Sequence, residues 1–218
     1  EKAFSTTSID SFFISPNVEN LKDGWCKNIN NLNSVTISPS NKNFRYLDDE
    51  HQIIIGKSDT KGDIFDTIVF ANRSIQRATI PKFIKYIKPY AFEYCKKLNA
   101  IEFSEDSEIV SIGKNAFRLT CIESICIPSS LEEWSAYNSN LKKITVSPSN
   151  KNFGYLDDKH QIIVGKSDIE SDVFDTIVFA NRDIEKATIS KIIKYIKPYA
   201  FCKCKKLNQV DFSENSEL

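Results

Sequence analysis

Histidine and acidic side chains are the best candidates for acid–base or metal chemistry in this sequence. The two histidines, His51 and His160, each stand in the pattern Asp-Asp-x-His. A carboxylate near an imidazole can transfer protons or help to hold a metal ion. Each pattern begins a predicted β-hairpin, where polar side chains are common, so we interpret both as solvated turns. A Ca²⁺ site would need several more oxygen ligands than either pattern supplies.

The cysteines indicate buried thiols. Cys95 and Cys204 occupy equivalent positions, each three residues after an Ala-Phe pair, and free cysteine is among the most buried residue types. Cys202-x-Cys204 lacks a second pair at zinc-ligand spacing. The sequence also lacks a Gly-rich phosphate loop and a G-x-S-x-G nucleophile elbow. It therefore predicts a protein that is not an enzyme and holds no metal or cofactor.

Charge and length limit the classes of partner. Lys and Arg number 29, as do Asp and Glu, so no net field favours nucleic acid. No apolar run approaches the roughly 18–20 residues of a membrane-spanning helix, so we expect no membrane insertion by this segment. The sequence begins at Glu1, contains no methionine and ends inside a repeat. We therefore expect a piece of a longer chain, and the oligomeric state stays open.

The sequence is internally duplicated. Residues 35–109 return as residues 144–218 with a constant offset of 109 and most positions identical. Such copying is typical of repeat architectures, which work through the surface they present. We expect one continuous solenoid over residues 1–218, with large repeats at 35–143 and 144–218.

A shorter apolar period runs inside each copy, in the form L-x-x-L-x-L. Leu98, Ile101 and Phe103 show it, and the last apolar position of each set falls at Ile14, Ile37, Ile80, Phe103, Ile127, Val146, Ile189 and Phe212. Most steps fit the 20–29 residues of a leucine-rich repeat, in which each unit supplies one short parallel strand. The fourth and sixth positions of the pattern point into the core, and the residues between them point outward.

Two steps are longer, from Ile37 to Ile80 and from Val146 to Ile189. Each contains two β-branched runs joined by a polar connection, which predicts an inserted β-hairpin near 44–71 and near 153–180. Another full solenoid turn is the alternative, although Phe70 to Ile80 leaves little room for one.

The repeat resembles a known family. The run Ile87-x-x-x-Ala91-Phe92-x-x-Cys95-x-x-Leu98-x-x-Ile101-x-Phe103 is similar to the repeat of the treponemal-type, or BspA-like, leucine-rich repeat proteins. Its Lys-, Ile- and Asn-rich style particularly resembles surface antigens of trichomonad parasites. The resemblance implies a right-handed superhelix with parallel strands on its concave face, mostly β with short helices or turns, plus inserted hairpins. It also implies a cell-surface or extracellular location and adhesion to host cells, matrix proteins or other microbes.

Lysines and tyrosines form a further recurrent stripe. Lys82, Lys85 and Lys88 interleave with Tyr86 and Tyr90, and the second copy repeats the pattern. Acidic residues follow within a repeat, which favours a solvated edge of alternating charge. Glycan binding along this stripe stays an alternative.

Outward positions of the predicted strands are the candidate partner-binding residues. They are Thr36, Arg77, Thr79, Glu102, Thr145, Lys186, Thr188 and Asp211. Their recurrence predicts two equivalent docking patches suited to multivalent binding. The family resemblance implies that the partner is a host cell-surface or extracellular-matrix protein, or a glycan in the alternative above. A structural spacer, with the binding site elsewhere in a larger surface protein, is the alternative function.

Overall fold

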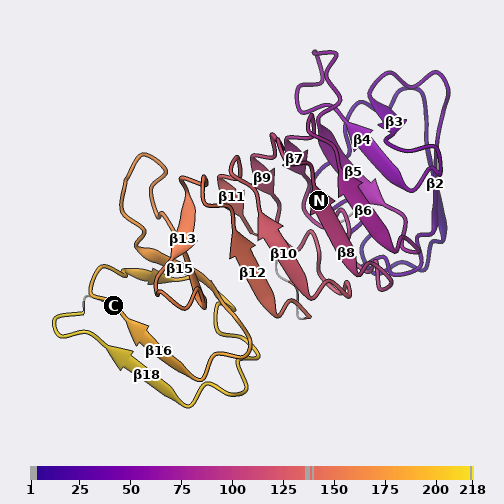
Figure 1. The fold of residues 1–218 in the computed structure, drawn as a ribbon. Helices are drawn as coiled ribbons and strands as arrows, with labels where there is room; N and C mark the ends of the chain where they lie inside the picture. Colours follow the sequence, from indigo (N-terminus) through magenta and orange to yellow (C-terminus); the bar gives the residue numbers. More distant parts are fainter. Residues whose placement is uncertain (1–3, 136–137, 139, 217) are drawn as a thin grey trace. The chain divides into compact units, whose positions relative to one another are not determined.

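The structure, a computed structural model, describes residues 4–135, 138, 140–216 and 218. It divides into two compact units, the first comprising Glu1–Ile122 with Glu133–Asn140 and the second Glu123–Glu132 with Leu141–Leu218. Each unit is built from parallel pairs of strands and one antiparallel insertion, joined by turns (Figure 1). The described residues form strands and turns in place of the short helices that the family resemblance allowed, and among them no helix has the length and apolar character needed to span a bilayer.

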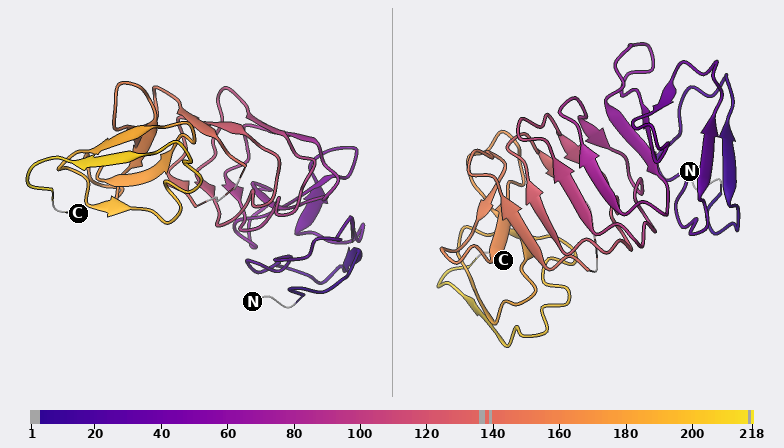
Figure 2. Two further views of the ribbon diagram at one scale, coloured as in Figure 1. Left: turned by 90° about the horizontal axis from the view of Figure 1, so that it is seen from below. Right: turned by 45° about the vertical axis from the view of Figure 1, so that its right-hand side comes forward.

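In the first unit, the L-x-x-L-x-L strands form two parallel ladders. These strands are β1 (Ser11–Ile14), β2 (Ser34–Ile37), β6 (Arg77–Ile80) and β8 (Ala100–Phe103). β1 pairs with β2 and β6 pairs with β8, so that equivalent repeat positions face each other. The strands of such a ladder run side by side in Figure 2.

The first unit also contains a six-stranded sheet that the apolar period did not predict. Its order is β11 (Glu133–Trp134), β9 (Ser111–Ile112), β7 (Tyr86–Ile87), β5 (Thr67–Ala71), β4 (Ile53–Gly56) and β3 (Phe44–Tyr46). β4 and β5 are antiparallel, which confirms the predicted hairpin, and β3 adds a third antiparallel strand. β5 then pairs in parallel with β7, so the inserted hairpin extends the stacked return strands of the solenoid.

The second unit repeats this plan. Its L-x-x-L-x-L strands are β10 (Ser124–Ile127), β12 (Lys143–Val146), β16 (Lys186–Ile189) and β18 (Gln209–Phe212). They pair in parallel as β10–β12 and β16–β18. Its second sheet contains β13 (Phe153–Tyr155), β14 (Ile162–Gly165), β15 (Thr176–Ala180) and β17 (Tyr195–Ile196). The L-x-x-L-x-L strands thus form two-stranded parallel ladders, and within each unit a three-stranded antiparallel insertion lies in sequence between the two ladders.

The corner after each return strand is a turn held by residues with left-handed backbone. Tyr90 and Tyr94 have φ values of 65° and 64° on either side of Ala91-Phe92. The Phe92 amide donates to the Ala116 carbonyl oxygen at 2.9 Å, and the Tyr90 amide donates to the next corner in the same way. These bonds stack one corner on the next, while the buried Phe92 fills the space between the sheets.

The same corner occurs earlier in the chain with a different sequence. Gly24 and Asn28, with φ of 74° and 58°, flank Trp25-Cys26, which replaces Ala-Phe. Both Trp25 and Cys26 are buried in the apolar cluster of this unit. An Ala-Phe pair also stands at 3–4 in the sequence, but only its Phe4 belongs to the described residues.

Candidate interaction surfaces

The first candidate surface is the outward face of β6 and β8. Arg77, Thr79 and Glu102 are exposed there, whereas the alternating residues Ala78 and Ile80 are buried, as the sequence pattern predicted. Thr79 stands opposite Glu102 in the ladder. Arg77 Nη2 lies 2.8 Å from Glu102 Oε1, with both side chains mostly exposed. An exposed pair of this kind contributes little to stability, about 0–1 kcal/mol, so both charged groups are available to a partner at small cost.

The equivalent surface in the second unit lies on β16 and β18. Thr188 stands opposite Asp211, as Thr79 stands opposite Glu102. Lys186, Thr188 and Asp211 are all exposed. Asp211 accepts a hydrogen bond from Gln209 Nε2 at 2.8 Å. The two patches therefore present the same arrangement of hydroxyl and carboxylate with different local pairing.

Two further predicted residues lie on other ladders. Thr36 is exposed on β2 and faces Phe13 of β1, whose side chain is 58% exposed. Thr145 on β12 faces Cys126 and is half-buried, with its hydroxyl donating to the Ile125 carbonyl oxygen at 3.5 Å. The structure therefore brings the eight predicted residues together in pairs of strands, and not in a single patch.

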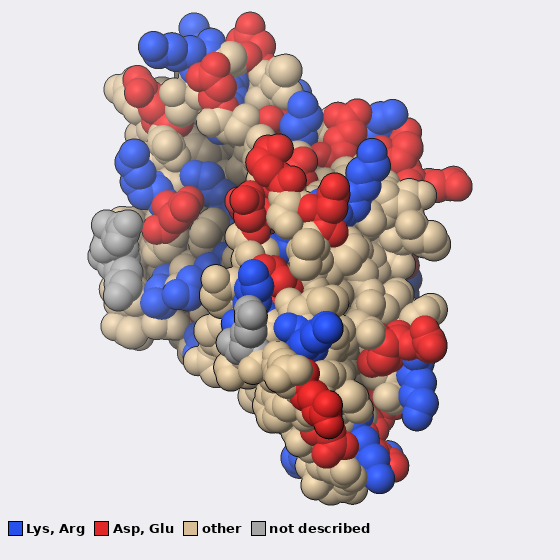
Figure 3. All heavy atoms as spheres, turned by 90° about the vertical axis from the view of Figure 1, so that its left-hand side faces the viewer, with Lys and Arg blue, Asp and Glu red and all other residues tan. Residues whose placement is uncertain are grey.

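The lysine stripe is partly neutralised by neighbouring carboxylates. Lys82 Nζ lies 2.7 Å from Asp106 Oδ2, and this hydrogen bond raises the pKa of Lys82 and lowers that of Asp106. Lys88 Nζ lies 3.5 Å from Asp23 Oδ1. On the face shown in Figure 3, basic and acidic groups are interspersed. This arrangement favours the solvated edge over a continuous cationic binding stripe.

The two histidines lie in matching hairpin turns. The rings of His51 and His160 stack on Tyr46 and Tyr155, with centroids 4.0 and 4.1 Å apart. Both histidines are exposed and have left-handed backbone. The first aspartate of the first turn, Asp48, accepts two backbone N–H bonds that hold the turn closed. In the described part of the chain, no group of three or more His, Cys, Asp or Glu side chains has an arrangement that could hold a metal ion.

Cys95 is buried beside the guanidinium of Arg73. Arg73 Nη1 donates to the Ala91 carbonyl oxygen at 3.2 Å and lies 3.9 Å from Cys95 Sγ. Burial raises the pKa of the Cys95 thiol to about 11, although Arg73 opposes the shift. Burial likewise raises the pKa of Cys26. Neutral thiols of this kind are poor nucleophiles, so these two cysteines serve packing.

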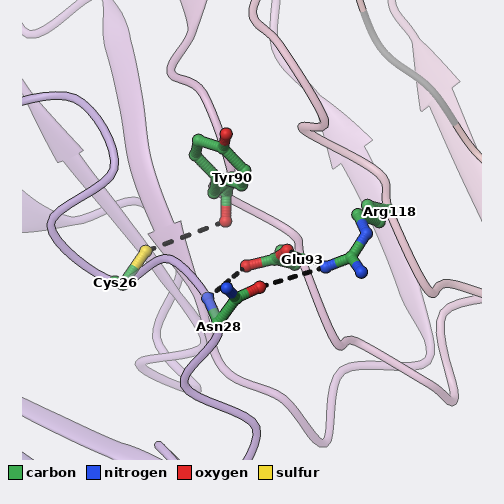
Figure 4. A network of polar contacts seen from close by, with 5 residues as sticks. All are labelled: Cys26, Asn28, Tyr90, Glu93 and Arg118. Carbon is green, nitrogen blue, oxygen red and sulfur yellow. Dashed lines mark hydrogen bonds and ion pairs between the residues drawn. The ribbon is translucent and has the colours of Figure 1, made fainter. Parts of the chain in front are cut away.

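A buried carboxylate forms a polar network that the sequence did not reveal. Glu93 is fully buried and accepts hydrogen bonds from the backbone N–H of Asn28 and from Arg118 Nη1, each at 2.7 Å (Figure 4). Arg118 Nη1 also donates to Asn28 Oδ1 at 3.1 Å. The Glu93 carboxylate raises the pKa of Arg118. The network joins three successive corners, which are separated by 65 and 25 residues in sequence.

The stacked corners and in-register ladders match a known repeat. The model of the BspA type leucine-rich repeat region matches six copies over residues 1–47, 63–156 and 172–217. The chain belongs to this family. The BspA-type fold is that of leucine-rich repeat proteins, which are generally non-enzymatic and mediate protein interactions. A comparison with curated proteins found no match.

Solved structures share the BspA-type fold at low sequence identity. The pneumococcal vaccine antigen PcpA aligns with a TM-score of 0.59 and 16% identity, over 95% of this chain and 46% of PcpA. A leucine-rich repeat protein from Eubacterium ventriosum aligns with a TM-score of 0.56 and 19% identity, over 93% of this chain and 48% of that protein. A leucine rich cell surface protein from Faecalibacterium prausnitzii aligns with a TM-score of 0.51 and 14% identity, over 94% of this chain and 61% of that protein.

These likenesses establish the fold alone. The chain spans about half the length of the first two structures. All three structures come from bacteria, so the likeness to trichomonad surface antigens stays a prediction.

Proposed function

We propose that this chain is a non-enzymatic binding module of a cell-surface or extracellular protein. In this proposal, the outward strand faces engage a host cell-surface or extracellular-matrix protein. The observation that carries the proposal is the repeated placement of Thr79 with Glu102 and of Thr188 with Asp211, exposed and in register. The surface location is supported by the Faecalibacterium relative, described as a cell surface protein, and by the pneumococcal vaccine antigen.

Duplication gives the proposed module a means of gaining affinity. When two equivalent sites can engage one partner surface, the second contact becomes intramolecular and strengthens binding without any new chemistry. We propose further that the two large repeats form one continuous solenoid over residues 1–218. A repeat architecture of this kind would present both patches to an extended partner.

Direct binding of the 218-residue chain to defined partners tests the proposal. Biosensor surfaces carrying fibronectin, laminin or collagen, together with cultured host cells, are suitable probes. We expect binding to at least one, weakened about tenfold or more by combined alanine replacement of Thr79, Glu102, Thr188 and Asp211. Glu133→Ala, on the six-stranded sheet, is the matched control and should bind normally.

The outcomes separate the proposed function from the spacer alternative. Binding that survives the fourfold replacement would show that the outward strand faces are not the docking surface. If the chain bound none of the matrix proteins and none of the host cell types, the result would favour a structural spacer.

A further inference from the structure

A polar depression of about 530 Å³ lies beside the Glu93 network in the first unit. Its lining consists of the hydroxyl-bearing segment 6–8, the amide side chains of Asn28, Asn30 and Asn31, and the side chains of Tyr94 and Arg118. The volume lies within the range of about 300–1,000 Å³ that is typical of small-molecule sites. None of the lining residues belongs to the strand faces of the proposed function.

Successive corners of the repeat build this depression. Thr6, Asn28 and Tyr94 occupy the same corner position and have φ of 63°, 58° and 64°. Left-handed backbone is uncommon for such residues and often marks functional sites. Here it recurs at Leu119 and Lys203, so it belongs to the repeat itself. What distinguishes the depression is therefore the set of side chains that the corners present.

Glu93 is not part of the lining, but it holds two of the lining residues and balances the charge of one of them. Its buried carboxylate accepts hydrogen bonds from the backbone N–H of Asn28 and from the Arg118 guanidinium, each at 2.7 Å. Arg118 is therefore compensated by a full negative charge. Tyr94 lies beside this pair, with the Arg118 guanidinium 6.0 Å from its ring centroid. Because no carboxylate lines the depression, its surface combines one neutralised cation with neutral polar groups.

The hydrogen-bonding groups of the lining are both donors and acceptors. Thr6 and Thr7 donate their hydroxyl protons to the carbonyl oxygens of Ser5 and Phe4, which leaves their oxygens as acceptors. Within the described residues, Asn30 and Asn31 make no side-chain hydrogen bond, so each offers an amide donor and an acceptor.

We propose that this depression binds a neutral saccharide of one or two sugar units. Each sugar hydroxyl both donates and accepts, which matches the amides and hydroxyls of the lining. The ring of Tyr94 supplies an apolar body with a polar tip, suited to the C–H face of a pyranose. Lys96 Nζ lies 5.9 Å from the Tyr94 ring centroid but is not part of the lining, so within the lining itself a charged sugar would meet no uncompensated opposite charge. The depression therefore selects for neutral, hydroxyl-rich ligands.

The second copy supplies an internal control for the site. Lys203 occupies the position of Tyr94, and Cys202 occupies that of Glu93. The equivalent corner therefore lacks both the aromatic ring and the carboxylate. One saccharide site for each chain is expected, in contrast to the two equivalent protein-docking patches.

Ligand-observed NMR with the full chain tests this site. Lactose, N-acetyllactosamine and mannobiose are the neutral probes, and sialyllactose and a heparin disaccharide are the charged comparators. We expect at least one neutral sugar to bind with a Kd on the order of 1 mM. Tyr94→Ala should weaken binding about tenfold or more, whereas Tyr94→Phe and the matched variant Lys203→Ala should retain it.

A second variant protects the test from a folding defect. The Asn31 side chain is exposed and makes no hydrogen bond within the described residues, so Asn31→Ala should fold normally and still weaken binding. The saccharide site would be overturned if no neutral sugar bound, if a charged sugar bound more tightly, or if both Tyr94→Ala and Asn31→Ala bound normally. These outcomes are independent of protein docking on the strand faces.

Discussion

Ile87 and Ile196 occupy equivalent positions in the two copies, but their side chains are buried to different extents. Ile87 is 2% exposed and Ile196 is 39% exposed. β7, which contains Ile87, pairs with β5 on one side and β9 on the other. β17, which contains Ile196, pairs within the described residues only with β15. Replacing each isoleucine by alanine therefore measures what a stacked neighbouring coil contributes.

The expected magnitudes follow from this burial. Isoleucine to alanine removes three carbons, worth about 2.4 kcal/mol at roughly 0.8 kcal/mol each when fully buried. At Ile87 an enclosed cavity adds to this, which gives about 3–4 kcal/mol. Only about three fifths of the Ile196 side chain is buried and the space left by the substitution stays open to water, so we expect a cost of about 1.5 kcal/mol. The two costs should thus differ by about 2 kcal/mol.

Urea unfolding with three probes can separate these effects. Both tryptophans, Trp25 and Trp134, belong to the unit that contains Ile87, so fluorescence reports that unit. Circular dichroism reports both units, and amide hydrogen exchange of β15 reports the surroundings of Ile196. Losses equal within about 0.5 kcal/mol would refute the reasoning, because stacking would then contribute nothing measurable beyond the single coil.

Three further changes have expected outcomes. Glu93→Ala should lower the free energy of urea unfolding by about 3–5 kcal/mol, since it leaves the partly buried Arg118 guanidinium without its partner. Cys202→Ala, at the equivalent position of the second copy, should cost less than about 1 kcal/mol. Equal costs would contradict the role of the network. Gly113→Ala should lower stability by about 1–3 kcal/mol, because its Cβ would stand 2.6 Å from the Pro89 nitrogen, and an unchanged melting temperature would contradict this contact. The pKa of the Cys95 thiol is raised from 9.0 to about 11, so the folded chain holds this proton more tightly than the unfolded chain. The stabilisation from this group should be fully present below pH 9, and the free energy of unfolding should fall as pH rises toward 11, by up to about 1.4 kcal/mol for each pH unit. Cys95→Ala should flatten that fall.

Strands with strong alternation were predictable from the sequence. In Arg77–Ile80, the pattern assigned outward and buried positions correctly because a strand has a period of two. The hairpin was predictable from two β-branched runs. The return strands were not, because Tyr86–Ile87 is too short to show any period. The corner at Trp25-Cys26 was missed because its sequence departs from Ala-Phe.

The polar depression was beyond sequence reasoning for a different reason. Glu93 meets Asn28 and Arg118 only because the corners stack, and these residues lie far apart in the chain. No local pattern marks such a meeting. A signal was available in the duplication itself: Glu93 and Tyr94 differ from Cys202 and Lys203 within an otherwise well-copied segment. Departures from a copied sequence can therefore indicate where one repeat has acquired a separate role.

The central claim is that partners dock on the outward strand faces. The inserted hairpins are the competing surface, since Ile64 and Val173 near their tips are 67% and 49% exposed. The most direct measurement is the affinity of a bound matrix protein for two matched double variants, Thr79→Ala/Thr188→Ala and Ile64→Ser/Val173→Ser. We predict that the strand-face variant loses about tenfold in affinity while the hairpin variant binds like the wild type. Loss confined to the hairpin variant would contradict the claim.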